Sequence, residues 1–265
     1  MRAAAAALTL CLAWHGAARA QDEVPFVVTP DHVTLAMLEL AQVGPRDFVL
    51  DLGSGDGRIV INAARRFGAR GLGVEISPQL VETSRRNAAH AGVAERARFV
   101  EQDLFKTDLS AATVITMYLL QEVNLQLRPA LLALQPGTRI VSHDWDLGDW
   151  RPDRSVSVDA PDKPVGRDKR SRLHLWVVPA RVDGLWCGSG ALHGARLRVA
   201  QRHQLFDATL ALSAGEQLLA GRIDGVRLGA VGGFGAVLEG ARLRITQAGA
   251  APETVAGAAF ERCSG

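Results

Sequence analysis

The sequence predicts an α/β fold in which a seven-stranded, mostly parallel sheet covered by helices is followed by a small antiparallel β domain. Between about residues 31 and 179, short apolar runs alternate with amphipathic stretches, a pattern typical of parallel strands joined by helices. A glycine-rich turn at 53–57 follows the first apolar run. Beyond residue 181, glycine and two-residue alternation dominate, which favours antiparallel strands. We therefore expect one domain over residues 21–180 and a second over residues 181–265.

The first half of the sheet domain has well-marked helix boundaries. Asp31 can cap a helix that runs through Gln42. Ser77 places a capping hydroxyl before a proline, and Gly92 stands where that helix should stop. Strands are expected at 48–52, 72–76 and 98–102, and a further helix is expected at 58–67.

The second half of the sheet domain is expected to close the sheet. Strands are predicted at 113–117 and 139–143, with a helix over 122–134 between them. Pro129 lies inside that helix, so we expect a kink or a restart there. The runs at 155–158 and 173–178 leave little room for a helix between them, which predicts a hairpin with one antiparallel edge strand.

The first twenty residues predict a secretory signal peptide. Arg2 precedes an apolar run from 3 to 14, and small residues precede a cut after Ala20. We therefore expect a periplasmic or secreted protein; the alternative is an uncleaved anchor or a misassigned start, with the protein in the cytoplasm. The run is shorter than the roughly 20 residues that span a bilayer, so no stable membrane insertion is expected. In an oxidising compartment Cys187 and Cys263 would form a disulfide; the alternative is two buried thiols.

The number and type of the charged residues argue against two classes of function. The chain has 30 Lys+Arg and 28 Asp+Glu, and removal of Arg2 and Arg19 would leave equal numbers. A nucleic-acid partner is therefore not expected. Nearly all the basic residues are arginines, so a Schiff-base lysine is an unfavoured catalytic centre.

The glycine-rich turn predicts a ligand site. The strand at 48–52 carries Asp51 near its end and opens into Gly53, Ser54, Gly55 and Gly57, which lets a ligand lie against bare backbone beside a helix N-terminus. Dinucleotide-binding proteins place the third glycine one position later, which disfavours an NAD-linked reductase. The turn by itself could also be a tight strand-to-helix connection.

Two further acids stand at the ends of the next strands. Glu75 ends the second strand, where a carboxylate can accept both hydroxyls of a ribose. Asp103 follows the third strand, in the place of a group that contacts an adenine edge. Each acid alone could be a solvated strand end, but three at successive strand ends indicate one nucleoside site.

With these motifs the sequence resembles the class I S-adenosylmethionine-dependent methyltransferases, over roughly residues 24–178. The resemblance implies a Rossmann-like fold and S-adenosyl-L-methionine as cofactor. It implies that Gly53 and Gly55 lie close to the methionine moiety and that Asp51 lies near its amino group. Glu75 would hold the ribose and Asp103 the adenine amine.

A closer resemblance is to the non-SET, seven-β-strand protein-lysine methyltransferases, through Asp-Leu-Gly-Ser-Gly at 51–55 and the segment 114–124. It implies an acceptor that is a protein lysine. The chain departs from that pattern at Phe26 and Val28, where Tyr and Pro are common, and at 117–120. Phe26 and Tyr118 are candidate walls of the acceptor channel, and Glu122 could orient the amine or receive charge. The alternative function is an exported nucleoside-type ligand-binding protein without methyl transfer.

The segment 142–150 follows the fifth strand, on the rim where acceptors enter in this fold. His143 has carboxylates nearby and could be a base, but without a second His or a Cys it is a weak metal site, and no metal is expected. The favoured interpretation is a structural histidine beside a loop anchored by Trp145 and Trp150.

Overall fold

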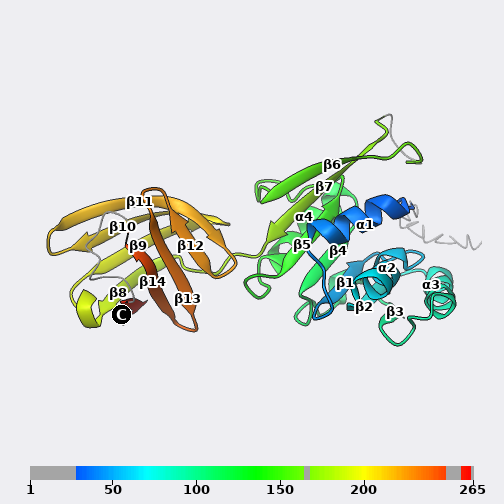
Figure 1. Ribbon diagram of the computed structural model, residues 1–265, viewed down its shortest axis with the longest axis horizontal. Coiled ribbons are helices and arrows are strands. Elements are labelled where there is room, and N and C mark those ends of the chain that lie inside the picture. Colours follow the sequence, from blue (N-terminus) through cyan, green and yellow to red (C-terminus); the bar gives the residue numbers. More distant parts are fainter. Residues whose placement is uncertain (1–27, 164–167, 249–257, 264–265) are drawn as a thin grey trace, which may run out of the picture.

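The computed structural model describes residues 28–163, 168–248 and 258–263. The predicted signal peptide at 1–20 and Phe26 lie outside the described residues. Two bodies follow one another along the longest axis of the molecule, a helix-covered sheet and a β-barrel (Figure 1). The sheet part contains α1 Asp31–Leu40, β1 Phe48–Leu52, α2 Arg58–Phe67, β2 Arg70–Glu75, α3 Pro78–His90, β3 Ala97–Glu101, the 3-10 helix η1 Leu104–Lys106, β4 Val114–Met117, α4 Gln121–Leu131, β5 Arg139–His143, β6 Arg154–Asp159 and β7 Arg170–Val177.

The predicted fold class is confirmed by a seven-stranded sheet with strand order β3-β2-β1-β4-β5-β7-β6. β1, β2, β3, β4 and β5 are parallel, whereas β7 is antiparallel to both of its neighbours. The antiparallel strand is therefore one place in from the edge, and the edge strand is β6. The prediction of an antiparallel edge strand was wrong in that detail, because the hairpin folds back so that β7, not β6, pairs with β5.

The two faces of the sheet carry separate apolar cores. Val33 and Met37 of α1 pack with Val49 of β1 on one face, and α2 and α3 extend that face. Leu127 of α4 packs on the other face with Leu50. Alternate residues of one strand thus serve opposite cores, which fixes the register of the sheet.

Three helix boundaries differ from the sequence expectation or sharpen it. Asp31 is the first residue of α1 and not its cap; Pro30 occupies the cap position without a side-chain hydrogen bond. Ser77 caps α3 through Leu80, as predicted. Pro129 does not restart α4, which continues to Leu131, because the helix is close to its end there and loses few backbone bonds.

The second body is a closed barrel of eight antiparallel strands in the order β10-β11-β12-β13-β14-β15-β8-β9. Its interior is filled by apolar side chains, including Trp186 and Phe260. The expected disulfide joins Cys187 and Cys263, with Cα atoms 5.1 Å apart. The barrel elements are β8 Gly184–Ser189, the 3-10 helix η2 Gly190–Leu192, β9 Arg196–Arg202, β10 Leu205–Leu212, β11 Gly215–Asp224, β12 Arg227–Ala230, β13 Phe234–Glu239, β14 Arg242–Ala248 and β15 Ala259–Arg262.

None of the helices in the described part of the chain has the length and apolar composition that a bilayer crossing needs.

Candidate active site

The glycine turn between β1 and α2 brings backbone close to the ends of the strands. Gly53, Gly55 and Gly57 have φ values of 75°, 54° and 83°, a left-handed conformation that glycine adopts at little cost. A Cβ on Gly57 would lie 2.7 Å from atoms of Phe99 and Ser84. Both the conformation and the packing of the turn therefore exclude a side chain at Gly57.

Glu75 holds this turn against the end of β2. Its Oε2 accepts a hydrogen bond of 2.9 Å from the Gly55 N–H, and its Oε1 accepts from the N–H groups of Ile76 and Ser77 at 2.9 and 3.0 Å. The carboxylate therefore shapes the turn. The predicted ribose contact stays a prediction.

Asp51 is a buried acid at the end of β1. Its side chain is 2% exposed and accepts a hydrogen bond of 2.7 Å from the hydroxyl of Thr116 on β4. Burial raises the pKa of Asp51 to about 7; the Thr116 hydrogen bond opposes this shift, and the charges of Glu75 and Asp56 add to it. A buried carboxylate that is costly to ionise alone suits a ligand that brings a positive group. Thr116 was missed from the sequence, where a strand threonine carries no signal.

The third predicted acid, Asp103, lies at the end of β3. Its Oδ1 accepts a hydrogen bond of 2.9 Å from the Phe105 N–H, and the Lys106 ammonium is 3.5 Å from its Oδ2. Ile76, which follows Glu75, is 66% exposed, and Phe105, which follows Asp103 by two residues, is 51% exposed. Two bare apolar side chains at adjacent strand ends offer faces for a planar ring, and the sequence reasoning did not single them out.

These cofactor-side residues share one edge, because β3, β2, β1 and β4 are neighbouring parallel strands. Asp51 and Glu75 are close enough for their charges to interact. Ser54, also predicted to bind the cofactor, is 5% exposed, and among the described residues its hydroxyl has no hydrogen-bond partner. Two surface hollows of about 430 and 520 Å³ lie elsewhere, on the barrel and beside α2. Neither hollow is lined by these residues, so the site is identified from the residues themselves.

Of the acceptor-side residues predicted from the sequence, Tyr118 lies beside His143 at the ends of β4 and β5, and its role as a channel wall stays a prediction. Tyr118 follows β4, and its ring stacks on that of His143 with centroids 3.9 Å apart. Its hydroxyl donates to Oδ2 of Asp144 at 3.4 Å. Burial, with a further contribution from the Asp144 charge, raises the pKa of Tyr118 to about 12. Glu122 is exposed in the first turn of α4, so its predicted role stays a prediction.

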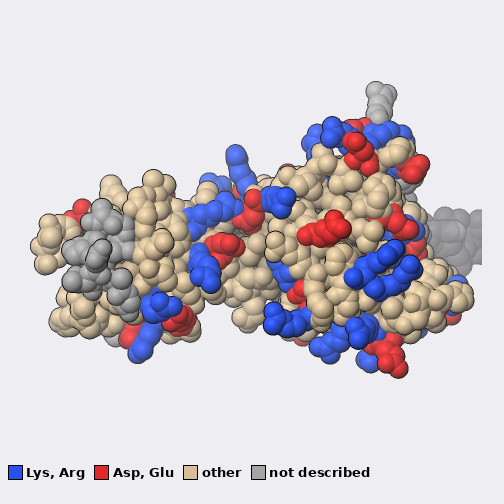
Figure 2. Space-filling view, viewed as in Figure 1, with Lys and Arg blue, Asp and Glu red and all other residues tan. Residues whose placement is uncertain are grey.

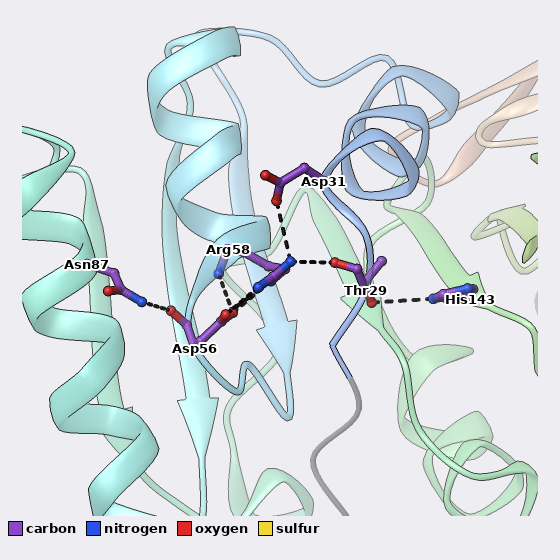
Figure 3. Close-up of polar contacts among 6 residues, drawn as sticks. All are labelled: Thr29, Asp31, Asp56, Arg58, Asn87 and His143. Atoms are coloured by element: carbon purple, nitrogen blue, oxygen red, sulfur yellow. Dashed lines mark hydrogen bonds and ion pairs between the residues drawn. The ribbon is translucent and has the colours of Figure 1, made fainter. Parts of the chain in front are cut away.

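His143 is fully buried and connects this end to the cofactor side. Burial lowers its pKa to about 4, against the opposing charge of Asp144, so the ring is neutral. Its Nδ1 lies 3.4 Å from the Thr29 hydroxyl, and Arg58 donates to the Thr29 carbonyl at 2.7 Å (Figure 3). The same guanidinium also donates a hydrogen bond to the Asp56 carboxylate. The segment before α1 therefore contacts both the first residue of α2, which is paired with Asp56 of the glycine turn, and the end of β5.

Within the described ranges no group of three or more His, Cys, Asp or Glu side chains is arranged to hold a metal ion.

Comparison with known proteins shows which family has this arrangement of residues. Residues 51–154 match the family model described as the ANTKMT methyltransferase domain. A protein-lysine N-methyltransferase of Saccharolobus islandicus is 44% identical over 138 residues, which cover 51% of this chain and 86% of that protein. The adenine nucleotide translocase lysine N-methyltransferase of Mus musculus is 36% identical over 132 residues, which cover 49% of this chain and 57% of that protein.

A solved structure supports the same assignment. A protein described as an RNA methyltransferase from Salinibacter ruber, crystallised with S-adenosyl-L-homocysteine, is 50% identical, with a TM-score of 0.54 and coverage of 59% of this chain and 96% of that one.

The residues present fit the cofactor that these relatives use. The buried carboxylate of Asp51 suits a cationic amino group, and the exposed side chains of Ile76 and Phe105 offer apolar faces to a base. A ligand-binding protein without methyl transfer is not favoured by the relatives, which are named as methyltransferases. The chain belongs to the class I S-adenosylmethionine-dependent methyltransferases, and its cofactor is S-adenosyl-L-methionine.

Proposed function

We propose that this enzyme methylates the side-chain amine of a lysine in a protein. The observation that carries the proposal is the 44% identity to a protein-lysine N-methyltransferase across 86% of that relative. The family model, which matches from the end of β1 into β6, supports it over the same strands.

The chemistry of such a transfer asks the protein for placement and for a suitable environment. S-Adenosylmethionine supplies an electrophilic methyl group when it is bound. Neutralising a lysine amine with a reference pKa near 10.4 at pH 7 costs about 4.6 kcal/mol, and an apolar surrounding lowers that cost by disfavouring the ammonium. The ring of Tyr118 is the candidate for such a wall beside the ends of β4 and β5, and the buried His143 ring stacked behind it is neutral.

The alternative acceptor is RNA, since the Salinibacter ruber protein is described as an RNA methyltransferase. The segments that follow β4 and β5 carry Glu122 and Asp146, which would repel phosphates. Two further acids in these segments are ion-paired, Asp144 with Lys163 and Asp149 with Arg128 and Arg202. On the face shown in Figure 2, positive and negative groups are interspersed and form no continuous basic surface. These features favour a protein acceptor.

The acceptor is tested by labelling with radioactive S-adenosylmethionine. A cell extract is divided, and one half is treated with ribonuclease and the other with protease before the products are separated. We expect protease-sensitive label, and mass spectrometry of digested protein should place a methyl group on lysine. Asp51→Asn serves as the low-activity control. Label that disappears only with ribonuclease would overturn the proposal.

We also propose that the protein is exported from the cytoplasm. The composition of residues 1–20 and the disulfide between Cys187 and Cys263 support an oxidising destination. Cell fractionation with mass measurement of the mature chain tests this. A chain that begins at Gln21 outside the cytoplasm is expected, and a chain that begins at Met1 in the cytosol would contradict it.

A further inference from the structure

Three side chains converge on a single oxygen at the acceptor end of the sheet. Oδ2 of Asp144 is 2.7 Å from Nζ of Lys163, 3.4 Å from the Tyr118 hydroxyl and 3.6 Å from Nε2 of His143. The residues come from the ends of β4 and β5 and from the connection between β6 and β7. None of them belongs to the glycine turn or to the acids predicted to bind the cofactor.

The backbone fixes this oxygen in place. Asp144 donates its N–H to the Arg172 carbonyl at 2.7 Å, and its Oδ1 accepts the Arg172 N–H at 3.0 Å. Its φ of 65° lies in the left-handed region, which costs a non-glycine residue on the order of 1–3 kcal/mol. Such a conformation persists only where the surroundings over-determine it, as these two hydrogen bonds to β7 do.

Lys163 compensates the charge of Asp144. Its ammonium is largely buried, and it also donates to the Arg170 carbonyl at 2.7 Å. Burial alone would raise the pKa of Asp144, but the Lys163 hydrogen bond and the other favourable contacts outweigh it and hold the pKa below its ordinary value. The carboxylate is therefore ionised, and the Asp144–Lys163 pair as a whole is neutral.

The pair also orients Tyr118. Because the Tyr118 hydroxyl donates its proton to Asp144, the lone pairs of its oxygen are left to accept a hydrogen bond from an approaching amine. The His143 ring, stacked on that of Tyr118, fixes the plane of the phenol. A hydroxyl fixed in this way can direct the nitrogen lone pair of an acceptor.

We propose that Asp144, with its charge balanced by Lys163, is a positioning residue that orients the Tyr118 hydroxyl toward the acceptor amine, and that this balance favours the neutral, reactive form of the amine. The inference rests on the proposed amine acceptor. An unbalanced carboxylate at this place would stabilise the ammonium, which has no free lone pair and cannot accept a methyl group. Lys163 is therefore required for the correct protonation state of the acceptor.

Other charged or titratable groups surround the cluster and are left unchanged by the test. His143 is neutral, and His174 on β7 has a pKa lowered chiefly by burial. The remaining groups are Asp146, Lys169 and Arg172.

The experiment is a pH–rate profile with a lysine-containing peptide that the wild-type enzyme labels. Lys163→Met should move the rising limb of the profile to higher pH by about one unit or more. The Asp144 carboxylate would then be unbalanced, and an opposite charge within a few ångströms raises the pKa of an amine by that amount. Asp144→Asn should move it to lower pH, and the double variant should return it near the wild-type position. Both variants that lack Asp144 should lose about tenfold or more in kcat, as should Tyr118→Phe, without a matching change in cofactor affinity.

A matched control removes a positive charge from an exposed ion pair. Arg86→Met breaks the contact with Glu82 at 3.5 Å on α3 and should leave the profile unchanged. If Lys163→Met binds cofactor poorly, the inference is tested by Asp144→Asn, whose rising limb should move to lower pH. An unmoved profile in a variant that binds cofactor normally would overturn this inference alone. Failure of the wild-type enzyme to label any lysine would overturn the proposed function as well.

Discussion

Binding of S-adenosylmethionine should release a proton from Asp51. The apo pKa of this residue is about 7, because burial outweighs the Thr116 hydrogen bond. At pH 6 about nine-tenths of the protein would therefore carry a protonated Asp51, and at pH 8 about one-tenth. If the amino group of the cofactor needs the carboxylate, its affinity should be about tenfold lower at pH 6 than at pH 8.

The assay is isothermal titration calorimetry in buffers of different ionisation enthalpy. At pH 6 the wild-type enzyme should release about 0.9 proton per cofactor bound, and at pH 8 about 0.1. Asp51→Asn should abolish the release and weaken binding at pH 8 by about 2 kcal/mol, or roughly thirtyfold. Thr116→Val should move the midpoint to higher pH, since the hydrogen bond that it removes favours the ionised form.

The control is Asp108→Asn, which changes an exposed acid on the connection between β3 and β4. Because the cofactor's own groups titrate identically with every variant, differences between variants report the protein. Equal proton release by the wild type and Asp51→Asn at pH 6 would refute the reasoning. The apo protein gives a second readout. The folded pKa of Asp51 lies above its unfolded value of 3.8, so its contribution to the free energy of unfolding should fall as pH rises from about 4 to 7.

Two further predictions follow from the same structure, one on the stability of the barrel and one on the packing of the glycine turn. Replacing Cys187 and Cys263 by Ser should lower the free energy of unfolding of the barrel by about 4 kcal/mol in a denaturant titration, with cofactor affinity unchanged; no loss would show that the bond is dispensable. Gly57→Ala should weaken cofactor binding about tenfold or more, because its Cβ meets Phe99 at 2.7 Å. Gly92→Ala has a similar left-handed φ with nothing within 4 Å, so it should cost only about 1–2 kcal/mol of stability; equal effects on binding would contradict the packing argument.

The elements that the sequence predicted best are those with local signals at both ends. The strands at 48–52 and 139–143 and the helix at 58–67 were found with the predicted bounds, since glycine or charged residues flank each apolar run. The helix from Asp31 ends at Leu40 and not at Gln42, whose φ of 51° already belongs to the turn before Pro45. Closure of the barrel could not be predicted, because β15 pairs with β8 about 70 residues earlier and no local pattern encodes that contact.

The candidate site divides in the same way. The glycine turn and Asp51 were identified from spacing within a few residues, and the structure places them at one strand end. The partner of Asp51, Thr116, and the partner of Asp144, Lys163, depend on strand order and on the β6–β7 connection. Long-range polar pairs of this kind leave no periodic signature in the sequence. They decide the protonation states on which the chemistry depends.

The barrel contacts the loop that follows β5, which the proposed function places beside the acceptor, so it is not an independent appendage. The turn between β9 and β10 places the Gln204 amide 2.6 Å from the Arg151 carbonyl and the His203 ring 6.1 Å from that of Trp150. Trp150 is fully buried in the core of the sheet, and its carbonyl accepts a hydrogen bond of 2.7 Å from the indole of Trp176. The same loop binds the first turn of α4, where Gln121 donates to Asp146 at 2.8 Å.

The loop after β5 is thus held by the sheet core on one side and by the barrel on the other. Removing the barrel would delete the Gln204 contact and expose the Trp150 side that His203 covers, at the base of the segment that begins with Asp144. A truncated sheet domain would therefore change the acceptor side while leaving the glycine turn and Asp51 in place. Such a truncation should therefore keep its cofactor affinity but lose methyl transfer. Activity is accordingly measured on the chain that retains the barrel.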